Sequence, residues 1–117
     1  MLRQMGRGLC ALSVLPCLLI AQQGRGTISG TVTDQSGATI RGAKITILNT
    51  DTNAAVVLQS NGEGNYTSPP LNVGAYEVAA EQAGFKKEIH GGIRLQVDQR
   101  AEINLQMSEF INFGRRS

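Results

Sequence analysis

Residues 61–85 place closely spaced turn signals between short alternating segments, and this arrangement restricts the fold more than any other part of the chain. The glycines at 62 and 64 supply the positive φ angles that a tight turn needs. Pro69-Pro70 stops the short strand that follows, because proline cannot donate to a strand ladder. Residues 75–80 then alternate so that one face is apolar. The pattern predicts short, half-buried β-strands.

Further strand signals lie on both sides of this stretch, at spacings near ten residues. Aromatic residues make up only 4% of the chain and Trp is absent, so the core has to be built from aliphatic side chains between frequent turns. No helical periodicity follows residue 21. The sequence therefore predicts an all-β fold, a seven-stranded antiparallel Greek-key β-sandwich. The further strand segments are 27–33, 43–49, 55–60, 86–90, 93–97 and 100–107.

Two details of these segments are specific enough to test. Gly30 lies inside the segment 27–33, and glycine within a strand marks a bulge or the close crossing of another backbone. Residues 93–97 and 100–107 both alternate and are separated by Asp98-Gln99, so we expect them to form the clearest hairpin of the chain.

Residues 1–21 read as a secretory signal peptide, expected to be helical. Arg3 and Arg7 precede an apolar run over 9–21, which is short for a bilayer span. We expect cleavage after Ala21 and export to the periplasm or outer membrane, or secretion. An uncleaved anchor is one alternative. A lipid anchor at Cys17 is another, although Pro16 stands where a small residue is needed.

Removing the leader changes the chemistry that remains. Cys10 and Cys17 both lie in it, so the mature chain has no thiol for a disulfide, a nucleophile or a metal site. Loss of Arg3 and Arg7 leaves basic and acidic residues equal in number, in place of the net charge of +2 of the whole chain. The remaining basic residues are scattered, so nucleic acid is not an expected partner.

The landmarks of the mature chain resemble those of the carboxypeptidase regulatory-like domain, a small transthyretin-like, or prealbumin-like, β-sandwich. Arg41 stands where members of that family usually have Pro. The resemblance implies a domain over 27–108, after a linker at 22–26 and before an irregular tail at 109–117, and it carries over no catalytic residue. The matching segments are 28–34, 36–38, 42–47, 64–66, 71–76 and 83–86.

Copies of this domain behind a leader resemble the amino-terminal extension of outer-membrane TonB-dependent receptors. No plug or barrel fits in the 117 residues. The resemblance therefore implies either a freestanding periplasmic sandwich or the front end of a truncated receptor. The implied partners are proteins or glycans at the cell envelope, with membrane contact only through the leader or a missing barrel.

Catalytic chemistry finds few candidates. His90 is the sole histidine, whereas a zinc peptidase needs several such ligands and a serine triad needs a positioned base. The glycine pairs lack the following helix of a phosphate loop. We expect no enzyme, cofactor or metal site, and a transthyretin-like enzyme is the weakest hypothesis. The aspartates at turns, Asp34, Asp51 and Asp98, are expected to bond their own backbone rather than calcium.

Two further hypotheses concern particular side chains. The first is a Lys-Asn crosslink within the chain, as in related adhesin repeats. It would use Lys44, Asn104 and Glu77, but strand parity predicts that all three face solvent.

Tyr66, Tyr76 and Phe85 could stack against a sugar, although the parity of two of them favours core packing. The leading expectation is a non-catalytic exported module. The alternative is a carbohydrate-binding module of the starch-binding-like superfamily.

Overall fold

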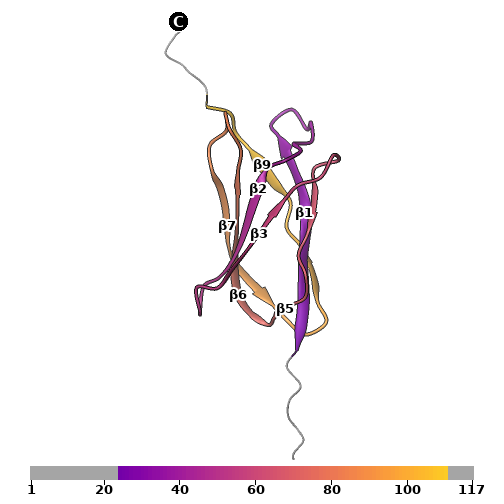
Figure 1. The fold of residues 1–117 in the computed structure, drawn as a ribbon, viewed down its shortest axis with the longest axis vertical. Helices are drawn as coiled ribbons and strands as arrows, with labels where there is room; N and C mark the ends of the chain where they lie inside the picture. The colour runs from indigo at the N-terminus through magenta and orange to yellow at the C-terminus, as the bar shows by residue number, and fades with distance from the viewer. Residues whose placement is uncertain (1–23, 111–117) are drawn as a thin grey trace, which may run out of the picture.

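Nine β-strands in two packed sheets make up the part of the chain that the computed structural model describes, residues 24–110 (Figure 1). The predicted leader, its helix, its cleavage site and most of the linker lie outside these residues. No helix capable of spanning a membrane is found within 24–110. The strands are β1 (Arg25–Asp34), β2 (Lys44–Asn49), β3 (Ala55–Gln59), β4 (Asn65–Thr67), β5 (Leu71–Asn72), β6 (Gly74–Glu81), β7 (Glu88–Leu95), β8 (Arg100–Glu102) and β9 (Leu105–Met107).

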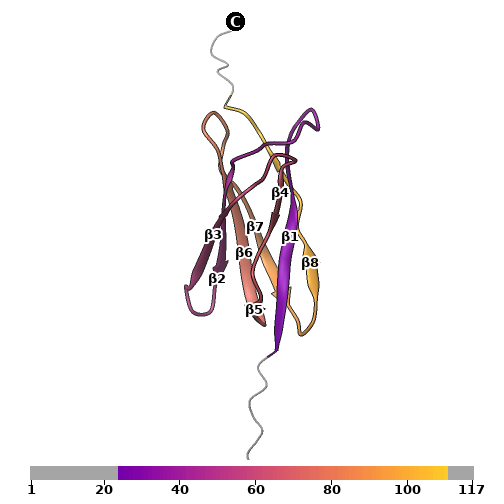
Figure 2. The same cartoon turned by 45° about the vertical axis from the view of Figure 1, so that its right-hand side comes forward.

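The two sheets have different topologies, as Figure 2 shows from a second side. In the first sheet β1 is central, with β4 and β5 antiparallel to it along one side and β8 and β9 parallel to it along the other. The second sheet has the order β3-β2-β6-β7 and is antiparallel throughout. The expectation of an all-β, two-layer sandwich is therefore confirmed.

The strand count exceeds the expected seven because two strands are interrupted. β4 and β5 lie end to end along β1 and are separated by Pro69-Pro70, as the sequence predicts. β8 and β9 lie end to end along the other side of β1. Each pair acts as one strand with a break.

The expected hairpin between 93–97 and 100–107 is wrong. β7 ends in the second sheet, and the chain then crosses to the first sheet, where β8 and β9 run parallel to β1. Hydrogen bonds to the start of β1 hold this crossover: Asp98 N donates to Arg25 O at 2.8 Å, and Thr27 N to Gln99 O at 2.9 Å. The strictly antiparallel expectation therefore fails at the last two strands.

Gly91-Gly92 separates the two expected segments 86–90 and 93–97, but in the structure it lies inside β7. Gly92 has φ of 71°, and the pairing with β6 shifts register between Tyr76 and Val78. The extra residue forms a β-bulge, which a glycine with positive φ accommodates without strain. The expected segments 86–90 and 93–97 thus belong largely to one bent strand.

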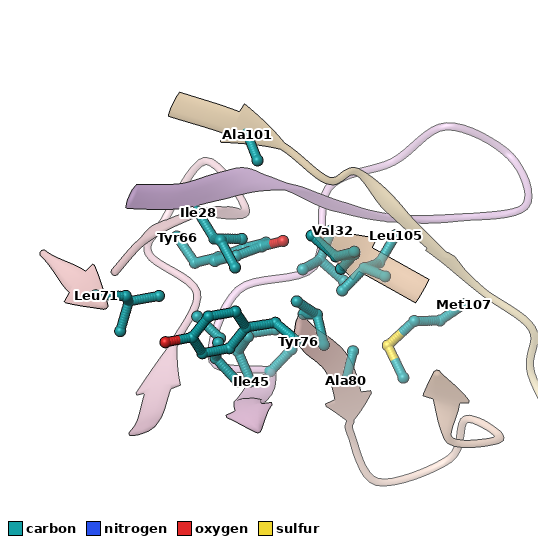
Figure 3. Close-up of a cluster of buried hydrophobic side chains, with 14 of the residues drawn as sticks. Ile28, Val32, Ile45, Tyr66, Leu71, Tyr76, Ala80, Ala101, Leu105 and Met107 are labelled. Carbon is teal, nitrogen blue, oxygen red and sulfur yellow. The ribbon is translucent and has the colours of Figure 1, made fainter. Parts of the chain in front are cut away.

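The core fills the space between the sheets with aliphatic side chains and two tyrosine rings (Figure 3). Alternate residues of β1, β2 and β6 point into it, which is the period-two pattern of the sequence. The residues of this cluster that Figure 3 labels are Ile28, Val32, Ile45, Tyr66, Leu71, Tyr76, Ala80, Ala101, Leu105 and Met107.

Gly30 confirms the predicted close crossing. A Cβ at this position would overlap the carbonyl oxygen of Ile103 and stand 2.9 Å from the hydroxyl oxygen of Tyr66. Ile103 N also donates to Ser29 O at 2.7 Å. The backbone at the break between β8 and β9 therefore packs directly against the middle of β1.

Candidate functional site

A hollow of about 500 Å³ lies at the end of the sandwich where β6 turns into β7. The last described residues leave the fold beside this turn (Figure 1). The hollow combines two aromatic rings with charged and amide side chains. It is lined by Gly42, Lys44, Glu81, Gln82, Ala83, Phe85, Lys87 and Phe110.

Phe110 reaches the hollow because the chain after β9 pairs with the β6–β7 turn. Lys86 N donates to the carbonyl oxygen of Ser108 at 2.8 Å, and Phe110 N to that of Gly84 at 3.0 Å. Phe85 and Glu109 form a β-bridge between these two bonds. The ring of Phe110 is left 64% exposed, so the hollow carries an aromatic side chain that water reaches.

Sequence reasoning missed Phe110, since it assigned 109–117 to an irregular tail. The structure differs at Glu109 and Phe110, which pair with the β6–β7 turn. Phe110 follows the alternating segment 100–107 without continuing it, and its partner lies at residue 84. No local signal identifies such a contact.

The charged groups of the hollow are solvated. Lys87 Nζ lies 4.0 Å from Glu81 Oε2, and their side chains are 54% and 42% exposed. Such a pair contributes about 0–1 kcal/mol. Lys44 lies opposite Glu81 in the register of β2 and β6. Gln82 Nε2 donates to Arg41 O at 3.1 Å, which fixes the amide at the rim. These groups remain available for polar contacts with a ligand.

The three residues considered for sugar stacking are not brought together as a surface platform. Tyr66 and Tyr76 are buried, which is the core packing that parity favoured. The Tyr76 hydroxyl donates to Asn72 O at 2.7 Å. The Tyr66 hydroxyl donates to Ile103 O, and burial raises the pKa of this phenol. Phe85 alone of the three lines the hollow, half-buried.

Two buried serine hydroxyl groups form structural hydrogen bonds with the backbone. Ser60 is buried, donates to Ile40 O at 2.7 Å and accepts from Ala43 N at 2.9 Å. Ser68 is also buried and accepts from Ile28 N at 3.0 Å. These serines hold strand ends to neighbouring backbone.

The remaining candidates for chemistry are dispersed over the surface. His90 is exposed on β7. Within residues 24–110 no three His, Cys, Asp or Glu side chains are grouped so that they could hold a metal ion.

Asp34 bonds its own turn, as expected. Its Oδ1 accepts from Ser36 Oγ at 2.7 Å, Ser36 N at 2.8 Å and Ala38 N at 3.0 Å. The hydrogen bond from the Ser36 hydroxyl leads the causes that lower the pKa of this carboxyl.

The residues considered for a crosslink lie apart. Lys44 is exposed on β2 in one sheet, and Asn104 is exposed between β8 and β9 in the other. Asn104 Oδ1 accepts from Thr31 N at 2.9 Å, which fills the gap in the ladder along β1. Glu77 is half-buried on β6 of the second sheet, where it lies opposite Leu48 and not Lys44. Lys44 and Asn104 are exposed, as strand parity predicts, whereas Glu77 is half-buried, and the three are not brought together.

Comparison with known proteins identifies the domain type. The family model of the carboxypeptidase regulatory-like domain matches residues 27–108. None of the curated proteins compared with the chain matches it.

Solved structures share the fold at low identity. The minor pilin GBS52 of Streptococcus agalactiae has 10% identity and a TM-score of 0.64, over 81% of this chain and 49% of the pilin. Catechol 1,2-dioxygenase of Acinetobacter radioresistens has 12% identity and a TM-score of 0.66, over 82% of this chain and 55% of the enzyme. A Bacteroides uniformis protein proposed to bind carbohydrate has 16% identity and a TM-score of 0.57, over 70% and 40%. The chain thus spans about half or less of each of these proteins.

Proposed function

The chain belongs to the carboxypeptidase regulatory-like domain family, and on that premise we propose that it is a non-catalytic, exported β-sandwich module with a structural or binding role. The use of its hydroxyl groups supports this proposal. Ser60, Ser68, Tyr66 and Tyr76 are all buried and bonded to backbone carbonyls or amides. These side chains stabilise strand packing and offer no free nucleophile or base.

Export rests on the leader-like residues 1–21. Expression of the full chain in a Gram-negative host, followed by cell fractionation and amino-terminal sequencing, tests it. We expect a periplasmic or outer-membrane product that begins at Gln22. A product that keeps Met1 and stays in the cytoplasm would contradict the export proposal.

We further propose that the module stands in front of a TonB-dependent receptor or derives from one. The arrangement of its ends supports this, because the chain enters β1 at one end of the sandwich and leaves the fold after β9 near the other end (Figure 2). A domain with this arrangement fits in line between other segments. The DNA that follows the Ser117 codon provides the test. A plug and barrel encoded there, in frame or after one frameshift, is the expected result; their absence would contradict it.

Carbohydrate binding is the second candidate, and one observation favours it. Phe85 and Phe110 line one hollow together with a carboxylate, Glu81, and an amide, Gln82. Aromatic rings beside a few polar groups are typical of ligand sites, and sugars present both apolar faces and hydroxyls. The fold is also that of the Bacteroides uniformis protein proposed to bind carbohydrate.

A glycan array followed by titration calorimetry tests this candidate. If a glycan binds in the hollow, Phe110→Ala should weaken binding by about tenfold or more, because the ring that contacts the sugar is lost. The substitution should cost little folding stability, because Phe110 is exposed. Val97→Ala is the matched control, because Val97 is 60% exposed and lines a different hollow. Absence of any glycan binding, or equal losses in both variants, would exclude the hollow as a sugar site.

A further inference from the structure

The free edge of β3 leaves a row of backbone groups unpaired. β3 ends the second sheet and pairs only with β2 within it. Asn49 N donates to Ala54 O at 2.8 Å and Ser60 N to Ala43 O at 3.0 Å. The backbone N–H and C=O groups of the even-numbered residues of β3 therefore point towards β2. By the alternation of an antiparallel ladder, the N–H and C=O groups of Ala55, Val57 and Gln59 point away from the sheet.

The other sheet edges of residues 24–110 each carry a device that discourages pairing. β7 has Glu88, Arg94 and a bulge, and the chain after β9 pairs with the turn that precedes it. β4 and β5 are short and are divided by Pro69-Pro70. β8 and β9 carry Arg100 and Glu102 and are also interrupted. Short strands, charges, proline and bulges are the usual protections of an edge.

β3 has none of these protections. It is an unbroken run of five residues, Ala-Val-Val-Leu-Gln, without charge, proline, glycine or bulge. Val57, at its centre, is 59% exposed. An edge of this kind is a template for another extended strand.

We propose that β3 pairs with β3 of a second copy of this chain, antiparallel, across a two-fold axis at Val57. Val57 then lies opposite its own counterpart, and Ala55 lies opposite Gln59 of the other copy. All three are hydrogen-bonded pairs, because their free N–H and C=O groups point at the partner. The two four-stranded sheets become one continuous sheet.

The side chains of the outer face suit an identical partner. In register, Val57 continues a row through Thr46, Ala79 and Ile89 across the whole sheet. The two-fold axis joins this uncharged row to its copy.

The charged rows also match. The row Glu81, Lys44, Gln59 meets the row Ala55, Leu48, Glu77 of the second copy. Like charges directly opposite each other would oppose pairing, and this register places none there. This charge match, and the lack of any charge on β3 itself, favour a second copy over a charged peptide. The proposal does not depend on export or on sugar binding.

Sedimentation equilibrium on the full chain, purified as it accumulates, tests the pairing. We expect a dimer with a dissociation constant below about 1 mM. Val57→Lys should raise this constant at least about tenfold, because two ammonium groups then lie opposite each other. The matched control is Ile89→Lys. Ile89 belongs to the same row and is 51% exposed, but it lies at the other edge; we expect a change of less than about twofold.

A strictly monomeric chain, or equal weakening by Val57→Lys and Ile89→Lys, would overturn the proposal. Thermal unfolding followed by circular dichroism verifies that both variants fold. If Ile89→Lys alone weakens the dimer, the contact lies at β7, and the proposal is again wrong.

Disulfide trapping fixes the register. In a Cys10→Ser, Cys17→Ser background, Val57→Cys should crosslink to itself, since hydrogen-bonded antiparallel pairs hold Cα atoms about 5.5 Å apart, within disulfide reach. Ala55→Cys should crosslink only when mixed with Gln59→Cys. Crosslinking of Ala55→Cys with itself would indicate another register or a parallel contact and would contradict the two-fold arrangement.

Discussion

Gly30 and Ile103 lie in backbone contact so close that a Cβ on Gly30 would overlap the Ile103 carbonyl oxygen and stand 2.6 Å from its carbonyl carbon. The same carbonyl accepts the Tyr66 hydroxyl, and the Ile103 amide donates to Ser29. Three strands of the first sheet, β1, β4 and the broken strand β8–β9, are therefore joined at one point. The stability of the sandwich should be sensitive to small changes at this junction.

Gly30→Ala should lower the free energy of unfolding by about 2–3 kcal/mol. The added methyl group has backbone on its near side, and overpacking of this kind costs about 1–3 kcal/mol. Chemical denaturation measures the change. Gly91→Ala is the matched control: Gly91 also lies in a strand, no atom lies within 4 Å of its Cβ position, and we expect a change within about 0.5 kcal/mol. Equal effects of the two substitutions would contradict the proposed contact.

Tyr66→Phe should cost about 1–2 kcal/mol while leaving the fold intact. The ring continues to fill the core, but the Ile103 carbonyl loses the hydroxyl that donates to it. Urea unfolding of the variant beside Thr67→Val provides the measurement, since Thr67 is the next residue and is exposed. We expect Thr67→Val to change stability by less than about 0.5 kcal/mol. A Tyr66→Phe variant as stable as the original would show that the bond contributes nothing.

Alkaline pH should destabilise the chain through Tyr66. Burial raises the pKa of the folded phenol above the value of about 10 in an unfolded chain. From that pH upward the unfolded chain releases the proton while the folded chain keeps it, so the free energy of unfolding falls as pH rises. Below the unfolded pKa the contribution is complete and constant.

Urea unfolding between about pH 8 and pH 11 measures this slope, and the difference from Tyr66→Phe isolates Tyr66. The variant should lose less stability over the same range. If both proteins decline in parallel above about pH 10, Tyr66 does not carry the effect.

Ser60→Ala should cost about 1–3 kcal/mol, although serine and alanine differ by one oxygen. The Ser60 hydroxyl accepts from Ala43 N and donates to Ile40 O in a buried place. Its removal leaves a buried donor and a buried acceptor without a partner. Thermal and urea unfolding measure the change. A cost below about 0.5 kcal/mol would mean that water takes over both bonds, which the burial of Ser60 argues against.

The sequence predicts which faces are buried much better than which strands become neighbours. Alternation in 93–97 and 100–107 marks most of their buried positions correctly, with Val97, which is 60% exposed, as an exception. The alternation is the same, however, whether the two segments form a hairpin or lie in different sheets. The choice depends on hydrogen bonds with the distant start of β1, where Asp98 N donates to Arg25 O and Gln99 O accepts from Thr27 N.

Glycine shows the same limit of local reasoning. Gly30 could be interpreted correctly because glycine weakens the interior of a strand, so that its presence there marks a bulge or a close backbone approach. Gly91-Gly92 fits a turn and a bulge equally well, and only its pairing with β6 decides. The candidate site depends even more on distant contacts, because Phe110 reaches the hollow through its bond to Gly84.

The parallel pairing of β1 with β8 and β9 has a mechanical consequence. The chain enters β1 at one end of the sandwich and leaves β9 near the other (Figure 1). Tension applied to the two ends pulls these strands along their lengths in opposite directions. Their hydrogen bonds are then loaded in shear, all at once, and do not open one after another. A module with this geometry resists stretching between whatever is attached at its two ends.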